Sequence, residues 1–286
     1  MSYYKISFNN WRQEAKISGL LDALERGFKK FDIDFFLIGA LARDTWMGLN
    51  NKKPKRTTAD VDFAILLPDA KTFTELKEYL VLEEGFIPYQ GNSFVLLWKD
   101  GTPVDLLPFG DIADNGTVRV EGTGFTTINV EGFREVYEGG LPEMELETGN
   151  HFKFCSLPGI VLLKFIAWED RPEIRGKDIL DISDILQHYF DIDSNNIYEN
   201  HSELFIDDDA ALMDIAATVL GRGMGAILKS NHAVANRVKA IIEVNTLSSY
   251  TTKIGAIMAA YFDNAIEENI ALLKRILSGI KDEMNK

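Results

Sequence analysis

The chain is poor in cysteine, histidine and proline. It has one cysteine, four histidines and eight prolines in 286 residues. A single cysteine, Cys155, excludes an internal disulfide framework and a zinc site built from several cysteines. We interpret Cys155 as a buried or inert thiol. There is no His-Glu-x-x-His motif, so the scattered histidines favour structural roles over metal ligation.

The chain also lacks long apolar runs and an excess of basic residues. No apolar run is long enough to span a bilayer, and the first residues lack the apolar stretch of a signal peptide. We therefore expect a cytoplasmic protein that has no membrane partner. The formal net charge of −14 argues against a protein that coats nucleic acid broadly.

Two carboxylates one residue apart are the most informative feature that is present. Asp60 and Asp62 lie at the start of the apolar, β-branched segment 61–67, which predicts a buried strand. Alternate side chains of a strand point to the same side of the sheet, and like charges so close repel each other. A divalent cation resolves this conflict, because Mg²⁺ binds carboxylates together with substrate phosphates. The alternative is a solvated strand start, since Asp-x-Asp is a common sequence.

A turn from strand to helix precedes the acid pair. Residues 34–38 are typical of a strand, and residues 39–47 have helical character. The free N–H groups and the positive end of a helix form an anion site, and a triphosphate is its natural occupant. Gly39 and Ala40 would form this turn, and Arg43 would face the same anion. The alternatives are a plain tight turn and a surface arginine.

A predicted hairpin supplies a third carboxylate. Residues 94–98 and 104–107 are typical of strands, with Asp100-Gly101 as the turn between them. Asp105 is the one acid in the apolar second strand, where a carboxylate needs a partner or a metal. Three acids that hold two metal ions would activate an acceptor hydroxyl and stabilise a leaving pyrophosphate. The alternative is a strand residue that faces solvent.

An isolated cation lies in a later apolar segment. The apolar positions of residues 157–171 recur at helical spacing, and Pro158 is near the expected helix start. Lys164 falls inside this run; one explanation is a side chain that snorkels at a domain seam. Lys177 and Asp178 follow later in the same block. They could equally form a surface ion pair that opens the next helix.

Together these motifs resemble the nucleotidyltransferase superfamily of DNA polymerase beta. That superfamily has a strand, a small-residue turn and a helix, then a strand with Asp-x-Asp, then a later acid. More narrowly, the run from Arg56 to Asp62 and the block around Lys164 resemble the AbiEii/AbiGii-type nucleotidyltransferase toxins of bacteria. The resemblance spans roughly residues 30–185. Ala40 replaces the usual second Gly or Ser of the turn, and residues 52–59 form an inserted loop.

The resemblance implies a metal-dependent nucleotidyltransferase that moves an NMP from an NTP to an acceptor hydroxyl. Asp60, Asp62 and Asp105 would be catalytic and would bind Mg²⁺ or Mn²⁺. The residues implied to bind the nucleotide and its phosphates are Gly39, Ala40, Arg43, Arg56, Lys164, Lys177 and Asp178. The implied acceptor is the 3′ end of tRNA, and the implied partner is a cognate antitoxin.

Two other functions remain open. The first is an antibiotic-type nucleotidyltransferase that acts on a small molecule, which the acidic charge slightly favours because aminoglycosides are cationic. The second is a non-catalytic module that binds a nucleotide or a partner. The basic residues of the two motif blocks are those expected of an enzyme that acts on an anionic substrate. These residues are Lys52, Lys53, Lys55, Arg56, Lys164, Arg171, Arg175 and Lys177.

The order of predicted elements gives a two-part organisation. An amphipathic helix at residues 11–30 would cover one face of a sheet, and residues 94–154 are rich in strands. We therefore expect an α+β fold, with a nucleotidyltransferase-type mixed α/β domain at residues 1–155. We expect a helical bundle at residues 156–286.

Within this bundle, helical patterns occupy residues 211–220, 232–244 and 254–277, and Asp207–Asp209 resembles a helix start. The Gly-rich run 221–225 indicates a helix break or a close-packing point.

Overall fold

The structure, a computed structural model, describes residues 3–6, 14–53, 55, 60–147, 149–205 and 211–286. The chain folds into two compact units, residues 1–156 and 157–286. Arg56 and the expected helix start at 207–209 lie outside the described residues. No helix in the described part of the chain is long and apolar enough to cross a membrane.

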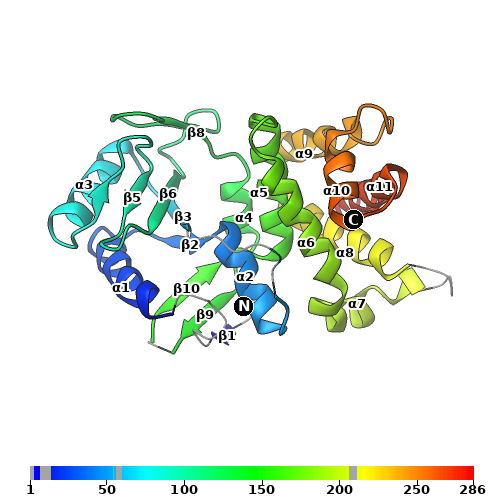
Figure 1. Ribbon diagram of the computed structural model, residues 1–286, viewed down its shortest axis with the longest axis horizontal. Helices are drawn as coiled ribbons and strands as arrows, with labels where there is room; N and C mark the ends of the chain where they lie inside the picture. Colours follow the sequence, from blue (N-terminus) through cyan, green and yellow to red (C-terminus); the bar gives the residue numbers. More distant parts are fainter. Residues whose placement is uncertain (1–2, 7–13, 54, 56–59, 148, 206–210) are drawn as a thin grey trace. The chain divides into compact units, whose positions relative to one another are not determined.

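A mixed sheet forms the centre of the first unit (Figure 1). Its strand order is β1-β9-β10-β2-β3-β6-β5-β4, and β7 pairs with β8 in a separate ribbon. The pairs β1–β9, β10–β2 and β3–β6 are parallel. The strands of the described residues are β1 Tyr3–Ile6, β2 Phe35–Leu37, β3 Val61–Leu66, β4 Ile87–Pro88, β5 Val95–Leu97, β6 Pro103–Phe109, β7 Thr117–Arg119, β8 Thr127–Asn129, β9 Glu143–Leu146 and β10 His151–Phe154.

Aromatic side chains attach helices to the two faces of this sheet. Helices α1 (Glu14–Lys30) and α3 (Ala70–Leu82) lie side by side in Figure 1. The Phe28 ring of α1 packs on Phe35 and Phe63, with centroids 4.3 and 6.0 Å away. On the opposite face, Phe133 of α4 (Phe133–Glu138) packs on Phe109 of β6. The expected covering of one face by α1 is therefore confirmed.

Most predicted elements of this unit are present within a residue or two. The strands β2 and β3, the β5–β6 hairpin and helix α2 (Gly39–Leu49) all form. Gly101 in the hairpin turn has φ +88, a conformation that glycine adopts without strain. Helix α4 was not predicted, because six residues in a strand-rich stretch are too few to establish a helical period.

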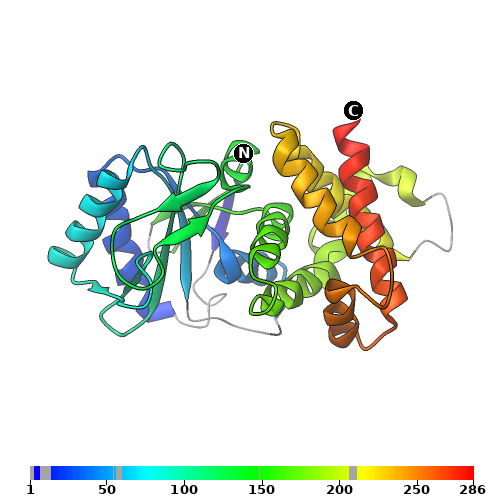
Figure 2. The ribbon, with the colours of Figure 1, turned by 90° about the horizontal axis from the view of Figure 1, so that it is seen from above.

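Helices form the second unit, and the mixed α/β fold class is confirmed. In the described residues they are α5 Leu157–Asp170, α6 Gly176–Ile192, α7 Ser194–Asn200, a 3₁₀ turn at Ser202–Phe205, α8 Leu212–Leu228, α9 His232–Val244, α10 Lys253–Phe262 and α11 Ile266–Met284. Helix α9 lies beside α11 in Figure 2. The expected helical segment 254–277 is two helices, because Asp263 takes a left-handed φ of +55.

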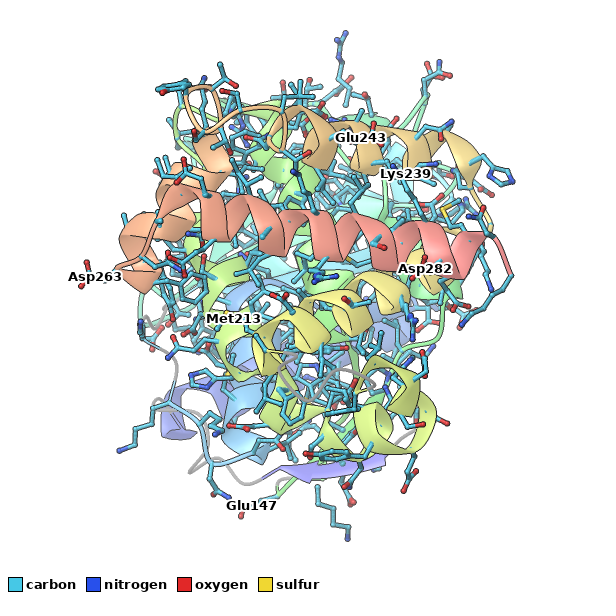
Figure 3. The ribbon with its side chains drawn as sticks, turned by 90° about the vertical axis from the view of Figure 1, so that its right-hand side faces the viewer. Glu147, Met213, Lys239, Glu243, Asp263 and Asp282 are labelled. Carbon is cyan, nitrogen blue, oxygen red and sulfur yellow. The ribbon has the colours of Figure 1, made fainter. Side chains whose placement is uncertain are left out.

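Glycines allow α8 and α11 to pack closely along their length (Figure 3). A Cβ on Gly221 would stand 2.1 Å from the Ile276 carbonyl oxygen. A Cβ on Gly279 would stand 2.1 Å from the Thr218 carbonyl oxygen. The run 221–225 lies inside α8, so it is a close-packing point and not a helix break.

Candidate functional site

Two of the three predicted acids lie side by side on neighbouring strands. Asp62 of β3 and Asp105 of β6 are direct partners in a parallel register. Phe63, the next residue after Asp62, packs on Phe28 of α1. Because successive side chains alternate across a strand, Asp62 and Asp105 point to the face opposite α1. Both residues are half-buried.

The third acid is placed differently. Asp60 precedes β3 and is exposed. Within the described ranges, no group of three or more His, Cys, Asp or Glu side chains is arranged to hold a metal ion. The structure therefore brings Asp62 and Asp105 together, and the three-acid metal site stays a prediction. Carboxylate oxygens are the donors that Mg²⁺ and Mn²⁺ prefer, so the donor set fits such an ion chemically.

The glycine of the predicted turn lies directly against one of these acids. Gly39 has φ +67, and a Cβ on it would stand 2.2 Å from Oδ2 of Asp62. The N–H of Ile38 donates to the Asp62 carbonyl oxygen at 2.9 Å, so the backbone also holds the turn beside this residue. Helix α2 begins at Gly39, and its N-cap residue Ile38 makes no side-chain capping bond. The first N–H groups of α2 thus begin next to the Asp62 carboxylate.

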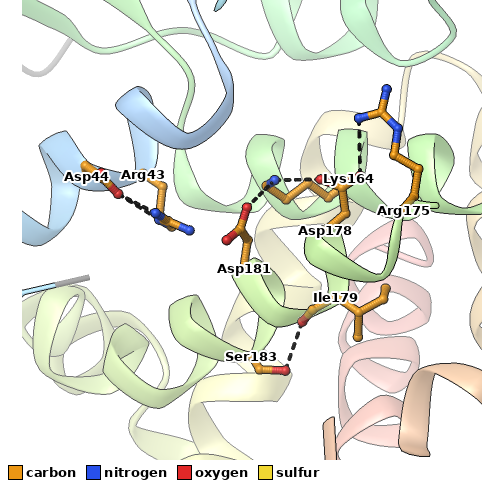
Figure 4. A network of polar contacts seen from close by, with 8 residues as sticks. All are labelled: Arg43, Asp44, Lys164, Arg175, Asp178, Ile179, Asp181 and Ser183. Carbon is orange, nitrogen blue, oxygen red and sulfur yellow. Dashed lines mark hydrogen bonds and ion pairs between the residues drawn. The ribbon is translucent and has the colours of Figure 1, made fainter. Parts of the chain in front are cut away.

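Arg43, expected to face a phosphate, is engaged within its own helix. The side chain is buried, with 1% exposure. Its Nε and Nη2 donate to Oδ1 of Asp44 at 2.8 and 2.6 Å (Figure 4). This pairing satisfies part of the guanidinium without a ligand. A phosphate contact by Arg43 stays a prediction.

Lys164 lies in a buried ion cluster of the second unit (Figure 4). Its Nζ donates to Oδ1 of Asp178 at 2.8 Å and to Oδ2 of Asp181 at 2.7 Å. Burial alone would lower the pKa of Lys164, but the two carboxylates outweigh burial and the pKa is raised. Lys164 is therefore an ammonium that is matched by two acids of α6.

Lys177 and Asp178 differ in burial, unlike the surface ion pair that the sequence suggested for them. Asp178 is buried, whereas Lys177 is exposed. Asp178 pairs with Lys164 and, at 3.5 Å, with Nη1 of Arg175. Asp181 was missed by sequence reasoning. Its spacing of three residues from Asp178 on a helix was the available signal, because such residues share a face.

Cys155 is fully buried, and burial raises the pKa of its thiol. The thiolate is the reactive form of cysteine, so a raised pKa leaves the side chain unreactive at neutral pH. The expected burial of Cys155 is confirmed.

Comparison with known proteins gives one family and one solved structure. Residues 22–262 match the model of a family described as nucleotidyl transferase AbiEii toxin, type IV toxin-antitoxin system. The solved structure is that of the antibiotic-resistance factor ANT(2'')-Ia, at 15% identity and a TM-score of 0.38, over 66% of this chain and 95% of that chain. No curated protein matches. Since the family model spans most of the sequence, the chain belongs to the AbiEii nucleotidyl transferase toxin family and is a nucleotidyltransferase.

Proposed function

We propose that this nucleotidyltransferase uses a divalent metal to transfer an NMP from an NTP to the 3′ end of tRNA, as the toxin of a toxin-antitoxin pair. Family membership supports the transfer reaction and the toxin role. The observation that carries the proposal is the contact of the Gly39 turn with Asp62, whose register partner is Asp105. A helix N-terminus and two carboxylates then lie where β2 ends and where β3 and β6 begin.

This arrangement suits a bound nucleoside triphosphate. The N–H groups of Gly39 and Ala40 would donate to phosphate oxygens at the positive end of α2. Asp60, Asp62 and Asp105 would hold Mg²⁺ or Mn²⁺, which would supply positive charge for the departing pyrophosphate. We assign to Asp105 the acceptance of the proton from the acceptor hydroxyl.

The remaining residues of the proposal are cations and their partners. Arg43, Arg56, Lys164 and Lys177 would neutralise phosphate charge, and Asp178 would orient Lys164. Lys164 already has two carboxylate partners. A direct phosphate contact therefore requires its ammonium to leave one of them or to share its third N–H.

A labelling experiment tests the reaction and the acceptor. Purified protein is incubated with each α-labelled NTP, Mg²⁺ and total tRNA, beside an Asp60→Ala/Asp62→Ala variant. We expect label on tRNA with the wild type alone, and the labelled NTP identifies the base. Labelled NTP that stays unconsumed with every tRNA preparation overturns the tRNA acceptor. Chelation by EDTA and re-addition of Mg²⁺ or Mn²⁺ tests the metal requirement.

A small-molecule acceptor is the second candidate, because a protein of net charge −14 attracts cationic substrates such as aminoglycosides. Replacing tRNA by aminoglycosides in the same assay separates the two acceptors. Binding of Mg²⁺–NTP without transfer to any acceptor would favour the non-catalytic module.

The toxin role is tested in cells. Expression of the wild type should arrest growth, and expression of an Asp62→Asn variant should not. Relief of the arrest by a co-expressed genomic neighbour would identify the cognate antitoxin.

A further inference from the structure

The indole of Trp46, on the helix that follows the Gly39 turn, is held from two directions. Its Nε1 donates to the carbonyl oxygen of Cys155 at 2.9 Å. Its ring centroid lies 5.1 Å from that of Phe154 in β10 and 5.3 Å from that of Tyr4 in β1. Tyr4 and Phe154 also meet edge to face, at 5.8 Å. The three rings form one cluster, which we call the Tyr4–Trp46–Phe154 cluster.

Cys155 connects this cluster to the other side of the turn. Its N–H donates to the carbonyl oxygen of Leu37 at 2.9 Å, at the end of β2. Its carbonyl oxygen accepts from Trp46 of α2. One residue therefore ties the chain both before and after Gly39. The two ties set the angle between the strand and the helix.

The N-terminal strand supplies the outer support of the cluster. Tyr4 pairs with Met144 in the parallel register of β1 with β9. This register carries the Tyr4 ring onto Trp46, although the two residues come from separate elements. Edge-to-face aromatic contacts contribute about 0.5–1.5 kcal/mol each beyond the area that they bury.

The geometry of α2 explains why such support matters for the reaction. The helix begins at a glycine with φ +67, which has no side chain to anchor its end. Trp46 lies about two helical turns further on, at 3.6 residues per turn. A helix that is free to tilt about Gly39 would carry its first N–H groups away from the Asp62 carboxylate.

We propose that Trp46 and Tyr4 are positioning residues for the nucleotide, which set the direction of α2 and hence the aim of its first N–H groups. This inference rests on the proposed triphosphate site at Gly39. Neither residue touches the nucleotide in this proposal. Their effect passes through the helix axis to the turn.

Three substitutions test the proposal. Tyr4→Ala removes a ring of the cluster, Tyr4→Phe keeps it, and Trp46→Phe keeps a ring but removes the Nε1–H donor. We expect Tyr4→Ala and Trp46→Phe to raise KM for the NTP about tenfold, because a displacement of about 1 Å can cost up to about 100-fold. Tyr4→Phe keeps the ring and should have the wild-type KM for the NTP. KM for the acceptor should stay unchanged in all three variants.

The control and the assay temperature separate positioning from folding. Tyr250→Ala removes a tyrosine that is 98% exposed, and it should leave KM for the NTP at the wild-type value. All assays are run well below the thermal unfolding midpoint of each variant. Variants with lowered midpoints but a wild-type KM would overturn the proposal and leave a purely structural cluster.

Failure of the proposed function gives a different result. If the wild type transfers no nucleotide, calorimetry with the Mg²⁺ complex of each of the four NTPs measures Kd in place of KM. We then expect a weaker Kd in Tyr4→Ala and Trp46→Phe and a wild-type Kd in Tyr4→Phe. A wild type that binds none of the four nucleotides overturns the triphosphate site and the positioning role with it. Nucleotide binding of equal strength in wild type and variants overturns the positioning role alone.

Discussion

Gly39 and Asp62 approach each other so closely that a side chain at position 39 would displace the Asp62 carboxylate. Beyond the 2.2 Å separation from Oδ2, a Cβ would stand 2.9 Å from Cγ of Asp62. Real Cβ atoms do not come this close to other heavy atoms. The turn and the carboxylate therefore form one unit, and a change in either displaces the other.

A Gly39→Ala variant should lose nucleotidyl transfer. The new methyl group must push the Asp62 carboxylate aside, and alanine at φ +67 is itself strained by about 1–3 kcal/mol. We expect the free energy of unfolding to fall by about that amount and kcat to become unmeasurable. Urea unfolding and the labelled-NTP assay measure the two effects.

Gly140→Ala is the matched control for this variant. Gly140 has φ +92, and a Cβ on it would meet no described atom within 4 Å. It shares the backbone strain but not the collision. Transfer by Gly140→Ala should therefore equal wild type at similar loss of stability. Equal activity of the two variants would mean that the Gly39–Asp62 contact is irrelevant to the reaction.

The carboxylate of Asp105 should matter for chemistry and not for folding. In Asp105→Asn the partner of Asp62 keeps its shape but loses its charge, so repulsion between the pair falls. We expect the variant to stay folded, with a cooperative thermal unfolding transition. Loss of a general base typically costs about 10²–10⁴-fold in kcat. Wild-type kcat in this variant would remove Asp105 from the mechanism.

Lys164→Met should destabilise the second unit. The substitution leaves Asp178 and Asp181 buried without their shared cation, and breaking a buried pair in this way costs about 3–5 kcal/mol. Adding Asp178→Asn and Asp181→Asn removes the two charges that the lysine had balanced and should recover part of the loss. Chemical unfolding of the single and triple variants measures both effects.

The Lys164 cluster also predicts a dependence on alkaline pH. The pKa of Lys164 is raised above its ordinary value of 10.5, so its contribution to stability is complete below pH 10.5. That contribution is lost as the pH rises through the higher, folded-state pKa. The difference in unfolding free energy between wild type and Lys164→Met should therefore shrink only above pH 10.5. A difference that already shrinks between neutral pH and pH 10.5 would contradict the raised pKa.

The Asp34 carboxyl should give the opposite dependence of stability on pH, in the acid range. Burial raises the pKa of its carboxyl, but hydrogen bonds from Lys153 and Tyr137 outweigh burial and bring the pKa below 3.8. Its contribution to stability is present above pH 3.8 and lost as the pH falls through the folded-state pKa. The difference in unfolding free energy between wild type and Asp34→Asn should therefore vanish as the pH falls below 3.8 and through the folded-state pKa. Asp111→Asn, which removes a carboxylate with 82% exposure, should cost little at any pH.

Larger residues at the α8–α11 contact should separate these helices. Gly221→Ala and Gly279→Ala each place a Cβ 2.1 Å from a backbone oxygen of the facing helix. Overpacking of this kind costs about 1–3 kcal/mol, occasionally more. Gly176→Ala is the control, because its Cβ would stand 3.7 Å from Ile257 and alanine favours a helix. Unfolding midpoints should fall for the first two variants and not for the third.

Local patterns were sufficient to predict much of the fold. The apolar segment after Asp60 became β3, and the Asp100-Gly101 turn joined the two strands of a hairpin. Helix α9 begins and ends at the predicted residues, His232 and Val244. These elements have enough residues to show a period of two or of 3.6. The six-residue helix α4 and the break at Asp263 lacked that length or that signal.

Side-chain partners were harder to predict than elements. The sequence singled out Lys164 as a cation inside an apolar run, yet its pairing with Asp178 and Asp181 was not recognised. It also suggested three acids at one site, whereas Asp60 is exposed and the register joins Asp62 to Asp105. Such pairings depend on which strands and helices become neighbours, and this is decided by contacts between distant segments.

By itself, the sequence determined the residue types of the proposed site and the elements that carry them. Acids at alternate strand positions and a glycine between strand and helix are local properties, since backbone periodicity decides where neighbouring side chains point. The tertiary structure alone decided that Asp105 lies beside Asp62 and that Cys155 bonds on both sides of the Gly39 turn. The physical reason is that strand register and helix direction come from the packing of the whole sheet. No short stretch of sequence encodes that packing.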